Sequence, residues 1–508
     1  MVQLSALSAN RRVAARALGS VAALALLAGC AVGPDFKQPP PPKTDAYLPE
    51  KVLPDTASTK VDAGQSQHFV VGKDIPGEWW TLFHSKQLDA LIVQALANNP
   101  DLAAAQAALR ASQENVLAGE GKFFPSVSAG GNAQRQKVSP ALSGIAGPSN
   151  IYNLYNASVS VSYAPDVFGG VRRQVESLQA QAEFQKFQLE ATYLALTSNV
   201  VTTVIAEASL RGQIATTQEL IKLQADLLGL LNQQFELGGI SRVDVVTQQA
   251  NLAQTQATLP PLQKQLAQTR NQLMTLIGNF PADDKGGAFQ LSDLTLPVDL
   301  PVSLPSELAR QRPDIRAAEA RLHQASADVG VATANLYPQF NITADIGSVA
   351  LTLAKLFSPG TFIWSLAGGV TQPIFRGGEL QHQKKAAEAV FEQSLAQYKS
   401  TLLGAFQDVA DALRALQSDA DALKAQDAAA RAAATSLNLA RAQFQAGATT
   451  YLSVLNAQQL YLTARINLVR AQAQRYADTA ALFQALGGGW WNRSDVGAPT
   501  SPAAQGKE

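Results

Sequence analysis

The chain has a single cysteine, Cys30, and its position favours one kind of chemistry. It ends the run Leu-Ala-Gly-Cys at residues 27–30, after an arginine-containing segment and a short apolar stretch over 17–28. This order is typical of an export signal, and the run itself resembles a bacterial lipobox. A lone thiol in an exported chain has no disulfide partner. We therefore expect a lipoprotein signal peptide over 1–29 and a covalent lipid on Cys30, a diacylglyceryl thioether plus an N-acyl chain.

The alternative for Cys30 is an ordinary signal peptide with an incidental cysteine. Several acyl chains anchor a protein firmly, at ~0.8 kcal/mol per buried methylene. Ala31 follows the cysteine where an aspartate would retain such a lipoprotein in the inner membrane. We expect an outer-membrane lipoprotein of a Gram-negative cell, in which the Pro-rich residues 30–77 form an extended tether without a core of its own.

Other chemistry is not indicated. The four histidines lack metal-ligand spacing, and neither a Walker loop, a nucleophile elbow nor paired catalytic carboxylates stand out. Equal numbers of acidic and basic residues, 40 each, give no basic field for nucleic acid. Three aspartates near Arg414 are interpreted as a hydrated face or lumen wall: Asp408, Asp411 and Asp419. The sequence predicts no enzyme, no metal site, no cofactor beyond the lipid and no transmembrane helix.

The same pattern occurs twice along the chain, about 210 residues apart, which indicates a duplicated unit. Each unit predicts a helix, a strand pair and two very long helices. The predicted domains are a first repeat over 78–290, a linker over 291–305, a second repeat over 306–489 and a tail over 490–508. The landmarks are residues 99–102 and 312–315, 165–170 and 373–378, and 235–238 and 444–447.

The predicted strands alternate apolar and polar residues strictly, as residues 158–163 and 340–346 show. This period suits a soluble sheet or a membrane barrel with a wet lumen. The outer-membrane address favours the barrel. Loops rich in Gly, Pro and Ser, near 136–155 and 350–360, should then face the exterior.

The predicted helices are very long. No proline lies between Pro165 and Pro260, and a helix over about 171–235 would measure roughly 100 Å. Its return partner runs from about 240 past 276, with Pro260-Pro261 kinking or interrupting it. Coiled-coil-like spacing of leucines favours close helix packing, and glycines end the helices at two hairpin tips. These leucines are Leu220, Leu223, Leu227 and Leu231.

An open sheet edge is not tolerated in lipid, and each chain has only four strands. Further copies of the chain are therefore required to close a barrel. Eight strands from two copies would be filled by side chains. Three copies give twelve strands and a lumen, which twelve long helices would continue across the periplasm. The predicted fold is mainly α with a membrane β-barrel part, a trimeric twelve-stranded barrel continued by an α-helical coiled-coil tunnel.

The chain resembles the TolC-like outer-membrane efflux proteins, specifically the lipoprotein branch of the OprM/NodT type. The resemblance covers the mature chain and implies a passive homotrimeric exit duct. Its implied partners are a periplasmic adaptor (membrane fusion protein) and an inner-membrane pump, usually of the resistance-nodulation-division (RND) class. Implied substrates are drugs, dyes, metals or other toxic small molecules. The matching residues are 33–36, 79–80 with Phe83, 312–319, 485–490 and the two hairpin tips.

Two functional regions follow from the resemblance. The tips match the turns at which adaptor hairpins dock; they comprise Leu237, Gly238, Gly239, Ala446, Gly447 and Ala448. Helix termination by glycine is an equally valid role for them. The periplasmic gate of the family often carries the pattern Asp-Val-Leu-Asp, but this chain has Ser-Val-Leu-Asn over 453–456.

The first repeat keeps an acid at Asp244, near Arg242. Because Ser453 and Asn456 are uncharged, an acidic, cation-attracting ring at this level is in doubt. We expect a gate closed by hydrogen bonds of Ser453 and Asn456, with Asp244 and Arg242 paired nearby. The alternative is that Arg242 and Asp244 are solvated tip residues.

Two other functions remain open on the sequence. A non-conducting scaffold lipoprotein would share the long helices and the anchor, but it needs no paired strands. A type I secretion duct would pass proteins instead of small molecules. The lipobox, the tether and the Gly-Gly-Gly-Trp ending at 487–490 favour the efflux branch.

Overall fold

The computed structural model describes residues 31–50, 54–139 and 149–494. Cys30 and the predicted signal peptide lie outside the described residues, as does most of the predicted tail. The chain forms two compact units. Unit 1 comprises Met1–Pro39, Leu109–Gln185 and Ala318–Tyr398, and unit 2 comprises Pro40–Ala108, Lys186–Ala317 and Lys399–Glu508.

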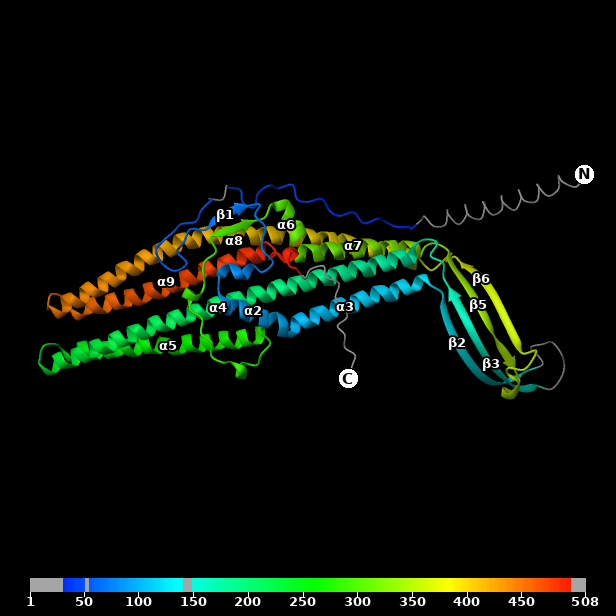
Figure 1. Cartoon of the computed structure of the whole chain (residues 1–508), viewed down its shortest axis with the longest axis horizontal. Helices are drawn as coiled ribbons and strands as arrows, with labels where there is room; N and C mark the ends of the chain where they lie inside the picture. The colour runs from blue at the N-terminus through cyan, green and yellow to red at the C-terminus, as the bar shows by residue number, and fades with distance from the viewer. Residues whose placement is uncertain (1–30, 51–53, 140–148, 495–508) are drawn as a thin grey trace, which may run out of the picture. The chain divides into compact units, whose positions relative to one another are not determined.

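The elements repeat in the predicted order of helix, strand pair and two long helices (Figure 1). The long helices match in length, with 67 residues in α4 and α8 and 35 in α5 and α9. The first set is α3 (Pro100–Glu120), β2 (Ser126–Val138), β3 (Asn150–Tyr163), α4 (Gly170–Glu236) and α5 (Arg242–Leu276). The second is α7 (Pro313–Ala334), β5 (Gln339–Ala350), β6 (Phe362–Thr371), α8 (Glu379–Gln445) and α9 (Tyr451–Ala485).

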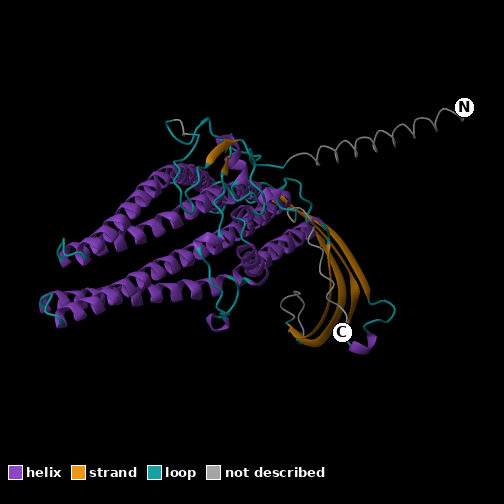
Figure 2. Cartoon of the chain, turned by 60° about the vertical axis from the view of Figure 1, so that its left-hand side comes forward, coloured by secondary structure: helices purple, strands orange, loops and turns teal. Residues whose placement is uncertain are grey.

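Unit 1 contains a curved antiparallel sheet with the strand order β2-β3-β5-β6 (Figure 2). The strands are longer than the alternating segments that the sequence shows. β2 ends at Val138 and β3 begins at Asn150, so these strands extend into the predicted loop near 136–155. Alternation gives the sheet an apolar face, with the row Ala129, Val159, Ile346 and Trp364. The opposite, polar face carries the row Ser128, Ser160, Asp345 and Ser365.

The corner between β3 and α4 shows why glycine follows each strand pair. Gly169 has φ +77°, a left-handed conformation that glycine adopts without strain. Asp166 then accepts hydrogen bonds from the backbone N–H groups of Val171 and Arg172, both at 2.9 Å, and so caps α4. Residues 168–170 therefore form the bend from strand β3 into helix α4.

The N-terminal segment of unit 1 is held by specific contacts. Asp35 pairs with the buried Arg173 at 2.6 Å, and the ring of Phe36 stacks on His323 with centroids 4.3 Å apart. Gly33 lies so close to Gly330 that a Cβ on it would be 2.5 Å from that Cα. The tether therefore begins as an ordered strap.

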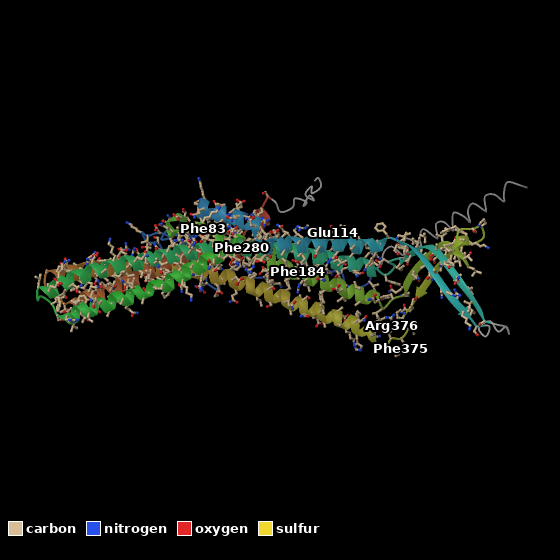
Figure 3. The ribbon with its side chains drawn as sticks, turned by 90° about the horizontal axis from the view of Figure 1, so that it is seen from below. Phe83, Glu114, Phe184, Phe280, Phe375 and Arg376 are labelled. Carbon is tan, nitrogen blue, oxygen red and sulfur yellow. The ribbon has the colours of Figure 1, made fainter. Side chains whose placement is uncertain are left out.

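Unit 2 contains the hairpin ends of the long helices and an aromatic core. Trp79 stacks on Phe483 at 5.4 Å between centroids, and Phe83, which Figure 3 labels, is fully buried beside Tyr476. Short helices α2 (Lys86–Asn98) and α6 (Pro305–Gln311) lie in the same unit. Helix α5 continues through Pro260-Pro261 without interruption.

A strand pair absent from the sequence prediction also belongs to unit 2. β1 (His68–Val71), in the tether, pairs in parallel with β4 (Asp299–Val302), in the predicted linker. The start of the predicted tail is also ordered, because Trp490 Nε1 donates to the carbonyl oxygen of Gln311 at 2.5 Å. Both segments therefore contribute to the body of this unit.

One described helix, α4, is long and apolar enough over 18 residues to cross a membrane by length and composition. Half of that window is buried inside the chain.

Candidate gate and docking tips

Each long-helix hairpin turns through the same backbone motif. At the first tip Gly239 N donates to Gln234 O at 2.8 Å and Gly238 N to Phe235 O at 2.9 Å. At the second tip Ala448 N donates to Gln443 O at 2.8 Å and Gly447 N to Phe444 O at 3.0 Å. These are Schellman pairs, in which a left-handed glycine ends the helix. Gly238 and Gly447 have φ +76° and +71°, so the predicted role in helix termination is confirmed.

Exposed apolar side chains surround the tips. Leu237 is 87% exposed, and Val243 and Leu452 at the starts of α5 and α9 are 72% and 60% exposed. Solvated leucine and valine at a glycine turn gain nothing for the isolated chain, whereas a partner helix could bury them.

The start of α5 differs from the sequence expectation. Ser241 and Asp244 form a capping box, in which the Ser241 hydroxyl accepts from Asp244 N at 3.3 Å. The Asp244 carboxylate in turn accepts from the Ser241 backbone N–H at 3.3 Å and from its hydroxyl at 2.8 Å. We expected Asp244 to pair with Arg242, but its carboxylate bonds to Ser241. The reason is that an acid at this helix position lies directly over the first free N–H groups.

The start of α9 holds the other predicted gate residues. Ser453 accepts a hydrogen bond from the Thr449 hydroxyl at 2.9 Å. Ser453 and Asn456 are both exposed on α9, whereas Val454 between them is fully buried. The two polar side chains therefore lie on the solvated side of the tip.

Tyr451 joins the two hairpins beneath these residues. Its ring packs edge-on against Phe444 of α8, and its hydroxyl donates to the Gln248 side chain of α5. Gln248 Nε2 then donates to the Gln224 carbonyl of α4 at 2.7 Å. Burial, and to a lesser extent the charge of Asp244, raises the pKa of Tyr451 to about 12, so the phenol stays a donor.

The sequence analysis missed Tyr451 and Gln248. The available signal was the repeat itself, since Tyr451 opens α9 at the place that Arg242 has in α5. The apolar cluster around Tyr451 consists of Leu227, Leu231, Val245 and Val454.

A second group of polar residues is buried in the body of unit 2. Arg475 is fully buried, and its Nη2 donates to Gln67 Oε1 at 2.7 Å. This bond attaches the tether to α9. Asp478, one turn along, is buried and lies against Asp419 of α8. Burial, followed by the neighbouring carboxyl group of Asp419, raises the pKa of Asp478 to about 7. Asp419 itself is half-buried, so it lies at the edge of the hydrated face and contacts a buried acid.

The chain matches known proteins over most of its length. The sequence profile of the outer membrane efflux protein family matches residues 91–279 and 304–488. The chain is 32% identical to the pyoverdine export outer membrane protein OpmQ of Pseudomonas putida over 423 residues, 81% of this chain and 88% of that one. It is 26% identical to a probable outer membrane lipoprotein, SilC, of Salmonella typhimurium over 473 residues, 93% of this chain and 98% of that one.

The fold is shared as well. The solved outer-membrane channel OprN superposes with a TM-score of 0.81 at 28% identity, covering 91% of this chain and all of that one.

The repeated hairpins, the four-stranded sheet and these matches define an outer-membrane channel of an efflux system. The chain belongs to the outer membrane efflux protein family, a family of transport components. The predicted family, location and channel function are confirmed.

Proposed function

We propose that three copies of the chain close into one twelve-stranded barrel, which the long helices continue as a tunnel. The observation that carries the proposal is the exposed apolar face of the sheet. Ten large apolar side chains of the four strands are exposed, and all except Ile363 lie on that face. Trp364, Leu366 and Val127 are 72%, 69% and 67% exposed. Lipid is the solvent that makes such a surface favourable.

The polar face suits a wet lumen. Among the described strand residues its only acidic or basic side chain is Asp345, which bonds to Ser160 on one neighbouring strand and to Ser365 on the other. Along β5 the apolar face runs from Phe340 to Ala350. That span is roughly 34 Å along the strand and roughly 26 Å high at a tilt of ~40°, close to the ~25 Å band of membrane barrels.

Both free edges of the sheet lie beside exposed apolar corners. Phe124, before β2, is 70% exposed, and Ile374 and Phe375, after β6, are 89% and 88% exposed (Figure 3 labels Phe375). A neighbouring copy that pairs its β2 with β6 would cover them and would remove the edges, which lipid does not tolerate.

The repeat predicts the register of this pairing. Ser126 opposite Ser162 and Gln339 opposite Thr371 hold equal places in the two hairpins. If the internal pair Ser162–Thr343 is carried over by that equivalence, Thr371 meets Gly130 of the next copy. Because the two strands would be antiparallel, moving four residues toward the loop end of each strand places Ala367 opposite Gln134 of the next copy.

The experiment is cysteine cross-linking in whole outer membranes. In the double variant Ala367→Cys/Gln134→Cys the two Cβ atoms would lie ~4.5–5.5 Å apart, near disulfide distance. We expect oxidation to give covalent dimers and trimers on denaturing gels, and reduction to reverse them.

The matched control is Ala367→Cys/Gln136→Cys, whose partners are diagonal at ~7–8 Å and should link much less. Each single variant should remain monomeric on the same gels. Equal linking of the two doubles, or none in either, would contradict the proposed ring and its register.

We propose further that Ser453 and Asn456 line a gate of uncharged polar groups at the periplasmic end, with Asp244 and Arg242 beside it. The Asn456→Asp variant tests this level, because three added carboxylates near one axis attract cations. We expect the cation-to-anion permeability ratio in planar bilayers to rise several-fold, and Asn456→Gln to leave it unchanged. An unaltered ratio in Asn456→Asp would argue against a gate here.

In this proposal the exposed tips dock a periplasmic adaptor, and an inner-membrane pump of the RND type that the resemblance implies supplies the energy. Cys30 carries the lipid anchor, which is supported by the relative SilC, a probable outer membrane lipoprotein. The repeats over 78–290 and 306–489 build the duct, and the tether and linker brace it. Small toxic molecules are the proposed cargo, in keeping with the pyoverdine exporter among the relatives.

A further inference from the structure

The loop end of the sheet has an unusual balance of charge. Residues 133–155 and 348–363 together contain Arg135, Lys137 and Lys355 and not one aspartate or glutamate. The whole chain has equal numbers of acidic and basic residues, so this excess is local. Three copies would gather nine cations around one rim.

Two of these cations lie on the apolar face. Arg135 pairs with Asn153 and Lys137 with Ile151, which places both in line with Val127, Ala129 and Ala133 of the same strand. Both are exposed. Charged side chains on a lipid-facing surface are costly at the bilayer midplane and nearly free at its edge. Arg135 and Lys137 therefore mark the level of the lipid headgroups in the proposed barrel.

An apolar hollow lies on the same face, closer to the middle of the membrane band. It has a volume of about 610 Å³, with small residues in its floor and large ones at its walls. The floor is formed by Gly131, Ala157 and Ser348, and the walls by Ile346, Phe357 and Phe362. Arg135 is four residues along β2 from Gly131, roughly 13 Å.

We propose that this hollow and the adjacent cations form a binding site for a lipid with an anionic, phosphate-bearing headgroup. The acyl chain fills the hollow, and Arg135 and Lys137 bind the phosphate as charge-assisted donors. Lys355 lies two residues before Phe357 and adds a third cation at the same end. The inference rests on the proposed barrel, since only there does the apolar face meet a bilayer.

A lipid fits this site better than a free anion does. Both cations are exposed, so they would hold phosphate alone only weakly in water. When the acyl chain of a lipid occupies the hollow, its phosphate is already held at the depth of the cations. Binding of the phosphate then costs little further entropy. The proposed register sets only Val370 of a neighbouring copy beside Gly131, which leaves the rest of the hollow open.

The test is native mass spectrometry of the delipidated full-length protein with dioleoyl phosphatidic acid, and with dioleoyl phosphatidylcholine for comparison. We expect trimers to retain phosphatidic acid several-fold more than phosphatidylcholine. Arg135→Gln/Lys137→Gln should abolish that preference, whereas Lys264→Gln, an exposed cation of α5, should preserve it. Millimolar inorganic phosphate should displace little of the lipid.

The hollow is tested separately by Ala157→Leu, which fills it and leaves the cations intact. This variant should bind several-fold less phosphatidic acid, while Ser128→Leu, on the polar face, should bind as the parent does. Trimers without a headgroup preference, or unaffected by Ala157→Leu, would overturn this inference alone. A protein that stays monomeric would instead overturn the proposed barrel.

Discussion

Val161→Arg should prevent the protein from accumulating as a trimer in the outer membrane. Val161 lies in the middle of the apolar face, between Val127 and Ala344. An arginine facing lipid near the midplane costs ~2–4 kcal/mol, so three copies would lose roughly 6–12 kcal/mol, comparable with the whole stability of a typical fold. Blue-native gels of outer-membrane extracts should show the trimer reduced more than tenfold.

The control is the next residue of the same strand. Ser162→Arg carries the identical side chain on the polar face, opposite Ser126 and Thr343. In a wet lumen the guanidinium stays hydrated, so trimer yield should remain near that of the parent. If the two variants assembled equally well, the assignment of lipid and lumen to the two faces would be wrong.

Asp478→Asn should make the protein more stable at pH 8 and leave its stability almost unchanged near pH 4. Burial raises the pKa of Asp478 from its ordinary 3.8 to about 7. The folded state therefore holds a proton that the unfolded state has lost, and the resulting stability disappears as the pH rises from about 4 to 7. At 1.36 kcal/mol per pKa unit, the difference above pH 7 approaches roughly 4 kcal/mol.

Asparagine cannot ionise, but it can still donate to Asp419 and accept from Gln474 Nε2, the groups that contact Asp478 with Arg475 nearby. Urea unfolding at pH 4, 6 and 8 measures the effect, with Asp411→Asn, an exposed change on α8, as the control. A variant that is less stable than the parent by the same margin at every pH would show that Asp478 is not protonated in the fold.

The sequence predicts the long elements well because their ends are marked locally. The first long helix, expected over about 171–235, is Gly170–Glu236, since a glycine turn precedes it and another follows it. The pairing of β1 with β4 could not be predicted. Its two four-residue strands lie more than 200 residues apart, and neither shows an alternating pattern.

The candidate site divides in the same way. The glycine turns at the tips could be predicted, because a left-handed turn favours glycine. The replacement of the family's acids by Ser453 and Asn456 is also visible in the sequence. The link from Tyr451 to Gln248 joins side chains 203 residues apart and depends on how the hairpins pack. Asp244 was expected to pair with Arg242, but the capping position offers it nearer donors on Ser241.

The most direct test of the proposed duct is the native mass of the protein extracted from outer membranes in mild detergent. We predict a single species with the mass of three lipidated chains. A stable monomer would leave each four-stranded sheet with two open edges in lipid, and would contradict the barrel on which the duct depends.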